Sequence, residues 1–218
     1  MSRKNLLVVA LALGLALLAH AEEMYSILSF GAKSDSQFLN TSAIQKAIDN
    51  AYTNGGGTVY IPAGTFLTGS LKLKSHVSLY LESGATLLGS TDLVDYDVNI
   101  PEYRSYTDNY NERSLIYAEK AEKISILGRG TINGQGSDFK GFSTASDPYK
   151  NRPFLIRMVQ CKNILVRDVT LIDSPMWVQH YYAQKSSDIM VAGNDFRKVE
   201  KIIRSENQND NHGILLKN

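Results

Sequence analysis

The sequence contains little cysteine and no excess of charge of either sign. Cys161 is the sole cysteine among 218 residues, so no disulfide can form within the chain and a cysteine-based zinc site is excluded. We expect Cys161 to be a buried small hydrophobic residue. Lysine and arginine number 23 against 22 aspartate and glutamate residues. This balance argues against a nucleic-acid partner, because binding phosphates requires a basic face.

Long apolar runs are absent except near the start of the chain. Arg3 and Lys4 precede Leu6–Leu18, which carries no polar side chain, and the sequence AHA at 19–21 fits a small-x-small cleavage pattern. The run is shorter than the roughly 20 apolar residues of a membrane span. The sequence therefore predicts a signal peptide over 1–21, a periplasmic or extracellular location, and no membrane association after cleavage.

The remaining composition is that of an ordinary globular protein, which excludes a collagen, a long disordered tail and a polytopic membrane protein. Ser42 followed by Gln45 is a capping-box pattern. The apolar positions that follow it share one helical face: Ala43, Ile44, Ala47, Ile48 and Ala51. The sequence NGGG at 54–57 ends the pattern. We therefore predict one helix over Ser42–Thr53.

Short β-branched clusters separated by turn residues fill the rest of the chain. The apolar segments NILV at 163–166, DIMV at 188–191 and GILL at 213–216 recur 25 residues apart. A period in the twenties is typical of a solenoid whose coils bury their apolar residues by stacking, although a hairpin-built sandwich also has short strands. In a solenoid, the helix is expected to cover the open N-terminal end.

Longer segments resemble a known family. FGAKSD at 30–35, TSAIQKAIDNA at 41–51 and GGGTVYIPAGTFLTGSLKLKSHVSLYLESGATLLGS at 55–90 are similar to pectin-degrading proteins with a right-handed parallel β-helix. SLIYAEKAEKISILGRGTINGQG and RPFLIRMVQCKNILVRDVTLIDSPMW narrow the resemblance to glycoside hydrolase family 28, the polygalacturonases and rhamnogalacturonan hydrolases. The resemblance implies an all-β solenoid with an N-terminal capping helix over 22–218. It also implies a carbohydrate groove and inverting hydrolysis of a pectic polysaccharide, galacturonan or rhamnogalacturonan, without a cofactor.

The resemblance points to one weak catalytic candidate. Inversion needs a carboxylic acid and a carboxylate base, about 6.5–9.5 Å apart. In the family these come from an Asn-x-Asp-Gly motif and an Asp-Asp pair, followed by Gly-His-Gly and Arg-x-Lys. Aligned on Gly213, His212 stands at the aspartate position and Asp210 at the asparagine position. The other three motifs do not occur. We therefore expect Asp210 as the only candidate acid, and a β-helix domain that is incomplete at its C-terminal end.

Three functions remain open at this stage: a pectin-type hydrolase, a non-catalytic carbohydrate-binding β-helix, and a polysaccharide lyase of similar fold. Aromatic residues between 95 and 117 could stack on sugars, but we favour a packing role. For Trp177, a position in the core is expected at least as much as a contact with a sugar. His76 is expected to lie between coils. No histidine or carboxylate cluster has the spacing of a metal site.

Overall fold

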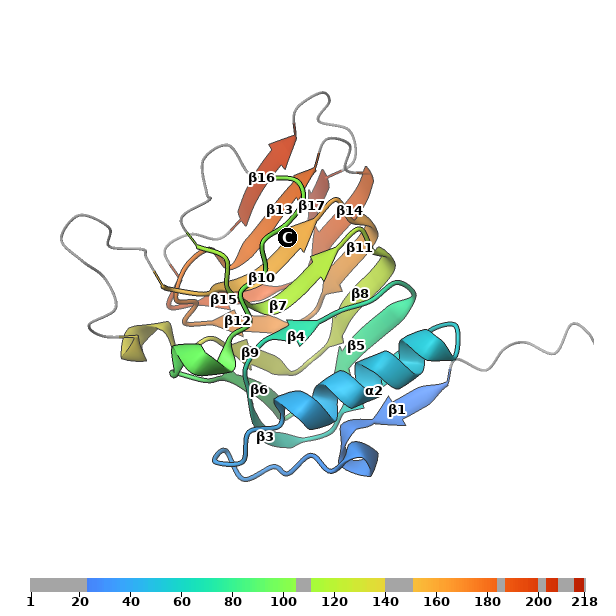
Figure 1. Ribbon diagram of the computed structural model, residues 1–218, viewed down its shortest axis with the longest axis vertical. Helices are drawn as coiled ribbons and strands as arrows, with labels where there is room; N and C mark the ends of the chain where they lie inside the picture. Colours follow the sequence, from blue (N-terminus) through green and yellow to red (C-terminus); the bar gives the residue numbers. More distant parts are fainter. Residues whose placement is uncertain are drawn as a thin grey trace, which may run out of the picture.

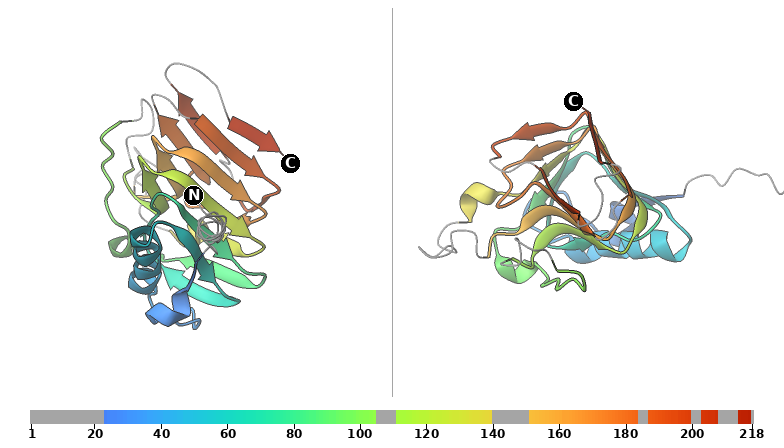
Figure 2. Two further views of the ribbon diagram at one scale, coloured as in Figure 1. Left: turned by 90° about the vertical axis from the view of Figure 1, so that its right-hand side faces the viewer. Right: turned by 90° about the horizontal axis from the view of Figure 1, so that it is seen from above.

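The chain folds into a right-handed parallel β-helix, as the family resemblance implies. The computed structural model describes residues 23–104, 111–139, 151–183, 187–199, 203–207 and 214–217. Within them the chain passes repeatedly through three parallel sheets, here named A, B and C in the order in which a coil visits them (Figure 1). Seen along the stack, the sheets form three walls (Figure 2). The side chains that these walls turn inward form one buried core.

Each sheet is built from strands that are one coil apart in sequence. Sheet A contains β1 (Met24–Ser26), β2 (Gly57–Ile61), β5 (Val77–Leu81), β8 (Glu122–Gly128), β11 (Lys162–Arg167), β14 (Ser187–Ala192) and β17 (Ile214–Lys217). Sheet B contains β3 (Gly64–Thr68), β6 (Ala85–Gly89), β9 (Thr131–Asn133), β12 (Thr170–Ile172) and β15 (Asp195–Arg197). Sheet C contains β4 (Leu71–Lys72), β7 (Ser114–Glu119), β10 (Phe154–Val159), β13 (Gln179–Ala183) and β16 (Ile203–Asn207). Short 3₁₀ helices occupy Ile27–Phe30, Leu93–Asp95 and Gly136–Asp138.

The 25-residue recurrence is confirmed by the strand register. Ile164 pairs with Ile189 in β11 and β14, and Ile189 pairs with Ile214 in β17. In the same sheet, Ile126, Val166 and Val191 are aligned and buried. Stacking identical or similar apolar side chains in successive coils is therefore what forms the interior of the solenoid.

At the corner between sheets C and A, the chain turns through residues with a left-handed backbone conformation. Lys123, Asn163 and Asp188 have φ values of 55°, 52° and 61°. They occupy equivalent places in successive coils, because Glu122 pairs with Lys162, and Lys162 with Ser187. A positive φ at one residue turns the chain sharply, and a non-glycine residue adopts it only where the surrounding structure requires it. The repeated conformation bends these three successive coils at the same point.

The predicted helix is present as α2 (Thr41–Thr53), the one α-helix among the described residues. It lies across the N-terminal end of the stack (Figure 1), and the five predicted apolar positions are all buried. The capping-box interpretation is wrong, because the helix begins one residue before Ser42 and its N-cap is Asn40. The hydroxyl of Thr41 instead accepts a hydrogen bond from the amide of Gly69, 2.7 Å away.

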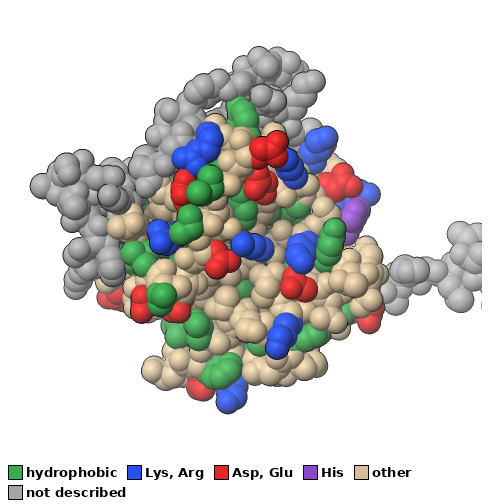
Figure 3. Space-filling view, viewed as in Figure 1, with side chains coloured by type: hydrophobic (Ala, Val, Ile, Leu, Met, Phe, Trp, Pro, Cys, Tyr) green, Lys and Arg blue, Asp and Glu red, His purple; other side chains and the backbone are tan. Residues whose placement is uncertain are grey.

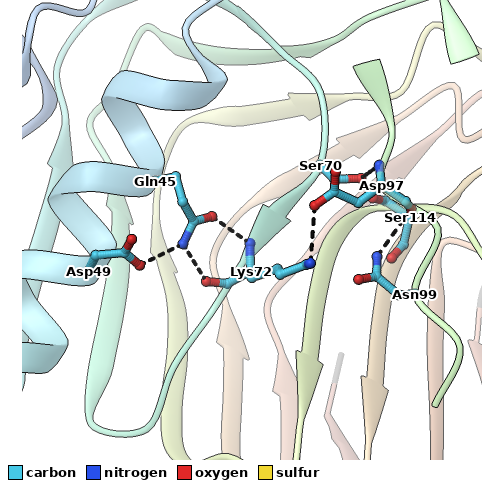
Figure 4. Close-up of polar contacts among 7 residues, drawn as sticks. All are labelled: Gln45, Asp49, Ser70, Lys72, Asp97, Asn99 and Ser114. Atoms are coloured by element: carbon cyan, nitrogen blue, oxygen red, sulfur yellow. Dashed lines mark hydrogen bonds and ion pairs between the residues drawn. The ribbon is translucent and has the colours of Figure 1, made fainter. Parts of the chain in front are cut away.

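Gln45 pairs with the backbone of the first strand of sheet C. Its Oε1 accepts from the amide of Lys72 at 2.8 Å, and its Nε2 donates to the carbonyl of Lys72 at 3.1 Å (Figure 4). Strand β4 is the edge of sheet C, so these two groups would otherwise be available to another chain. The side chain of Gln45 therefore takes the place of a neighbouring strand.

The long connection from β6 to β7 is fastened to the same edge (Figure 4). The hydroxyl of Ser70 donates to the carbonyl of Ser114 at 2.7 Å and accepts from the amide of Asp97 at 3.0 Å. The Asp97 carboxylate lies 3.1 Å from the Lys72 ammonium group. These contacts hold the connection close to sheet C, where it continues across the outer face of that sheet.

Candidate functional site

The outer face of sheet C carries Arg157, the one charged side chain that is buried among the described residues, together with buried aromatic and polar side chains. Along β7, β10 and β13, Ile116, Ile156 and Gln179 belong to the inner side and are fully buried. The alternate positions, such as Tyr117, Arg157 and His180, point outward. Phe154 at the start of β10 joins them, although it lies two residues before the inward Ile156. The outward side chains form a second cluster, here called the outer cluster: Tyr117, Phe154, Arg157, Val159, His180 and Tyr182, with Tyr103 packed against it. The cluster is covered by the connection that carries Tyr103 and Asn111.

Arg157 lies at the centre of the outer cluster and is 1% exposed. Its guanidinium carbon lies 4.8 Å from the ring centroid of Phe154 and 5.3 Å from that of Tyr182. Nη1 donates to the carbonyl of Asn111 at 2.9 Å, and Nη2 donates to the hydroxyl of Tyr182 at 3.0 Å. A buried cation is tolerable only when such partners replace its hydration. Arg157 therefore joins the covering connection to the sheet.

His180 continues the stack of rings. Its ring centroid lies 5.0 Å from that of Phe154 and 4.9 Å from that of Tyr182, with interplanar angles of 20° and 28°.

Burial raises the pKa of Tyr182 to about 12, and the nearby Arg157 charge opposes this increase. Tyr182 is therefore a neutral hydrogen-bonding group at ordinary pH.

Glu119 is the carboxylate nearest to this cluster, and both of its oxygens have partners. Oε2 accepts from the hydroxyl of Tyr117 at 2.8 Å, and Oε1 accepts from the amide of Glu102 at 2.9 Å. Burial, followed by the hydrogen bond to Glu119, raises the pKa of Tyr117 well above its ordinary value. Glu102 in turn pairs with Lys120. The described contacts of Glu119 thus link the connection to sheet C.

Several sequence predictions can now be located. Asp210 and His212 lie outside the described residues, so the catalytic prediction is untested. Cys161 is buried and its thiol pKa is raised to about 11, chiefly by burial, as expected for an unreactive residue. His76 lies at the corner before β5, and its Nε2 is 3.6 Å from a carboxylate oxygen of Glu122 in the next coil.

The packing interpretation of the aromatic residues is confirmed where the structure describes them. Tyr96 is buried, its ring meets Phe139 edge-on at 6.1 Å, and its hydroxyl donates to the carbonyl of Ser90. Tyr103 packs on Tyr182. Trp177 is half-buried, so it is not a fully enclosed core residue.

The described residues contain no metal site, and their charges are mixed on the face that Figure 3 shows. Figure 3 shows basic and acidic side chains interspersed over the visible face, without a large patch of one sign. No group of three or more histidine, cysteine, aspartate or glutamate residues in the described chain is placed to hold a metal ion. Among the same residues, no helix has the length and apolar character needed to cross a membrane.

Comparisons with known proteins agree with this architecture. The family model described as "Rhamnogalacturonase A/epimerase, pectate lyase-like" matches residues 24–133. A probable polygalacturonase of Vitis vinifera is 37% identical over 164 residues, covering 71% of this chain and 33% of the relative. An exo-poly-alpha-D-galacturonosidase of Dickeya chrysanthemi is 41% identical over 137 residues, covering 59% of this chain and 22% of the relative. The chain therefore spans a third or less of the length of these two relatives.

A solved structure shows the same fold. The family 28 exopolygalacturonase of Yersinia enterocolitica superposes with a TM-score of 0.62 at 24% identity, covering 79% of this chain and 43% of that one. The resemblance to glycoside hydrolase family 28 is thus confirmed. The chain belongs to the pectate lyase-like rhamnogalacturonase A/epimerase family.

Proposed function

We propose that the protein represented by this chain hydrolyses glycosidic bonds in pectic polysaccharides, galacturonan or rhamnogalacturonan, by the inverting mechanism of the polygalacturonases. The observation that carries the proposal is the identity of 37% over 164 residues with a probable polygalacturonase, in a chain that itself folds as a parallel solenoid.

The direct test of the proposal is the coding DNA that follows the codon for Asn218. Codons for Asp-Asp, Gly-His-Gly and Arg-x-Lys, in that order and in any reading frame, are the expected result. They would supply the second carboxyl group that an inverting mechanism needs. A following sequence without any of these motifs, in all three frames, would contradict the hydrolase proposal and favour a carbohydrate-binding β-helix.

The 218-residue chain itself is expected to release little or no reducing sugar from polygalacturonan or rhamnogalacturonan. Asp210 is the single candidate acid, and losing either the general acid or the general base typically costs a factor of about 10²–10⁴. Colorimetric assay of reducing ends measures this, with Asp210→Asn compared against Asp188→Asn. Asp188 is a suitable control because it is exposed and its left-handed φ is one that asparagine also adopts.

Substantial turnover that is lost in Asp210→Asn but kept in Asp188→Asn would overturn this expectation and make Asp210 a catalytic acid. Turnover that yields unsaturated products would indicate a lyase. Binding of the polymer without turnover would support the non-catalytic alternative for the chain.

We also propose that the protein is exported and cleaved after Ala21, because of the basic start, the apolar run and the AHA sequence. The expected result is a mature N-terminus at Glu22 in protein recovered from the periplasm or medium of its native host. Intact-mass analysis measures it. Protein that keeps Met1 in the cytoplasm would contradict the proposal.

A further inference from the structure

A groove of about 800 Å³ runs along the corner between sheets C and A, next to the edge of the outer cluster, because its residues Lys120 and Gln160 directly follow Glu119 and Val159. It crosses three successive coils and ends against the last turn of α2. Its lining residues are Tyr52, Ser75, His76, Lys120, Ala121, Glu122, Gln160 and Lys162. Neighbouring coils are about 4.8 Å apart, so the three corners repeat along a line roughly 10 Å long.

The floor of the groove is held by bonds between coils. The amide of His76 donates to the carbonyl of Glu122 at 2.9 Å, and the amide of Glu122 donates to the hydroxyl of Ser75 at 3.1 Å. The amide of Lys162 donates to the carbonyl of Ala121 at 3.0 Å. Lys120 and Gln160 follow paired residues of β7 and β10 and share φ values near 50°. Side chains from successive coils are therefore presented in register on a fixed backbone.

The polar groups of the groove are only partly used by the protein. Lys120 pairs with Glu102, and His76 lies near Glu122. Lys162 is exposed, and the ion pairs found among the described residues do not include it. Oε1 of Gln160 is buried without a hydrogen-bond donor in the described chain. The groove thus offers the Lys162 cation at its surface and the unsatisfied Gln160 acceptor beneath it, beside the Tyr52 ring, which is 48% exposed and has the Lys74 ammonium group over one face.

We propose that this corner groove is a binding site for a short segment of a uronic-acid chain, separate from the outer face of sheet C. A uronic acid presents a carboxylate for Lys162, hydroxyl groups for the side chain of Gln160, and a non-polar ring face for the side of the Tyr52 ring that Lys74 does not cover. Each of these complements a group that lines the groove. The choice of uronic acid rests on the proposed function, whereas the position of the site rests on the groove.

The experiment is a calorimetric titration of the 218-residue chain with a galacturonic acid hexamer. Lys162→Glu is expected to weaken binding about tenfold, because a charge-assisted hydrogen bond is replaced by repulsion. Arg129→Glu is the matched control. Arg129 is exposed and lies beyond β8, at the corner between sheets A and B, so the charge change is identical but distant from the groove. We expect less than a twofold change there.

A second ligand separates carboxylate recognition from sugar recognition. The fully methyl-esterified hexamer has the same sugar rings without the charge, so it is expected to bind the unmodified chain about tenfold more weakly than the acid. Lys162→Glu should remove this preference, and Lys162→Arg should keep it. The melting temperature of Lys162→Glu should stay within a few degrees of the original value, because the side chain is exposed.

Three results would overturn the groove proposal. Equal losses in Lys162→Glu and Arg129→Glu would mean that binding is general electrostatic attraction. Hexamer binding that is unchanged in Lys162→Glu would place the sugar elsewhere and leave the proposed function intact. A chain that binds no hexamer would also exclude the groove. In that case the proposed function is decided independently, by the motifs in the coding DNA after Asn218.

Discussion

Replacing both Ile44 and Ile48 with aspartate is expected to unfold the chain or drive it into aggregates. Both side chains are fully buried where α2 covers the first coil. Each substitution removes about 1.5–3 kcal/mol of hydrophobic burial and adds several kcal/mol for placing a carboxyl group in an apolar site. Together these costs exceed about 6 kcal/mol, which is comparable with the whole free energy of unfolding of an ordinary domain.

Aggregation is expected as well as unfolding, because α2 protects strand edges. If the helix detaches, Gln45 no longer pairs with Lys72, and the edge of sheet C is open to other chains. Size-exclusion chromatography and urea unfolding followed by circular dichroism measure the two effects. The double variant should be found in the void volume or the insoluble fraction.

Two control variants distinguish this effect from a loss of helix propensity. Lys46→Asp places the same residue on the exposed side of α2 and should cost at most about 1 kcal/mol. The pair Ile44→Val and Ile48→Val keeps the apolar surface and should cost about 0.5–1.5 kcal/mol at each site. A soluble double aspartate variant that melts with the unmodified chain would show that α2 does not cover the stack.

The role of α2 was predictable because its signal is local, whereas its exact start was not. Five apolar residues on one helical face show which side must be buried. The N-terminus is decided by tertiary contacts. The Asn40 side chain is fully buried and bonds to the backbone of Lys33 and Phe38, so it does not cap the helix that it precedes. A sequence pattern does not show whether the Asn40 side chain caps the helix or bonds to the backbone that precedes it.

The strands of sheet A were likewise predictable, and those of sheet C only in part. Ile164 and Ile189 recur with the coil, so their period is visible in the sequence. Strand β10 has all six residues buried, because the outer cluster covers the side that would normally face solvent. Strand β13 reads QHYYA, in which polar and aromatic residues show no alternation. The outer cluster forms because the connection between β6 and β7, which is distant in sequence from β10, covers this face. The sequence around Arg157 therefore does not indicate that this side chain is buried at the centre of the cluster.

Truncating Arg157 is the second change for which we expect a large effect, a loss of about 3–5 kcal/mol in the free energy of unfolding for Arg157→Ala. The substitution leaves a cavity between Phe154 and Tyr182 and removes the donors that serve Asn111 and Tyr182. Cavities from large-to-small changes cost about 2–5 kcal/mol, and a buried acceptor without a donor costs about 1–3 kcal/mol. Urea unfolding measures the sum.

Arg157→Met separates the packing of the side chain from its charge. Methionine fills most of the same volume, and removing a buried cation also removes the cost of its desolvation, so we expect a loss of only about 1–2 kcal/mol. If both variants were equally unstable, the hydrogen bonds to Asn111 and Tyr182 would outweigh the packing. The ranking of the two variants therefore shows which contribution dominates.

The same variants should reveal whether Arg157 holds the covering connection on sheet C. Cleavage by trypsin after Arg104 is expected to be at least about tenfold faster in Arg157→Ala, since local opening becomes more frequent when its anchors are lost. Tyr103→Ala tests the coupling, because Tyr103 packs on the ring of Tyr182 that also contacts Arg157. Its destabilising effect should shrink in the Arg157→Ala background, as for residues that share a partner. Additive losses together with unchanged cleavage after Arg104 would mean that the outer face of sheet C is covered independently of Arg157, by contacts such as those of Asp97 and Glu102.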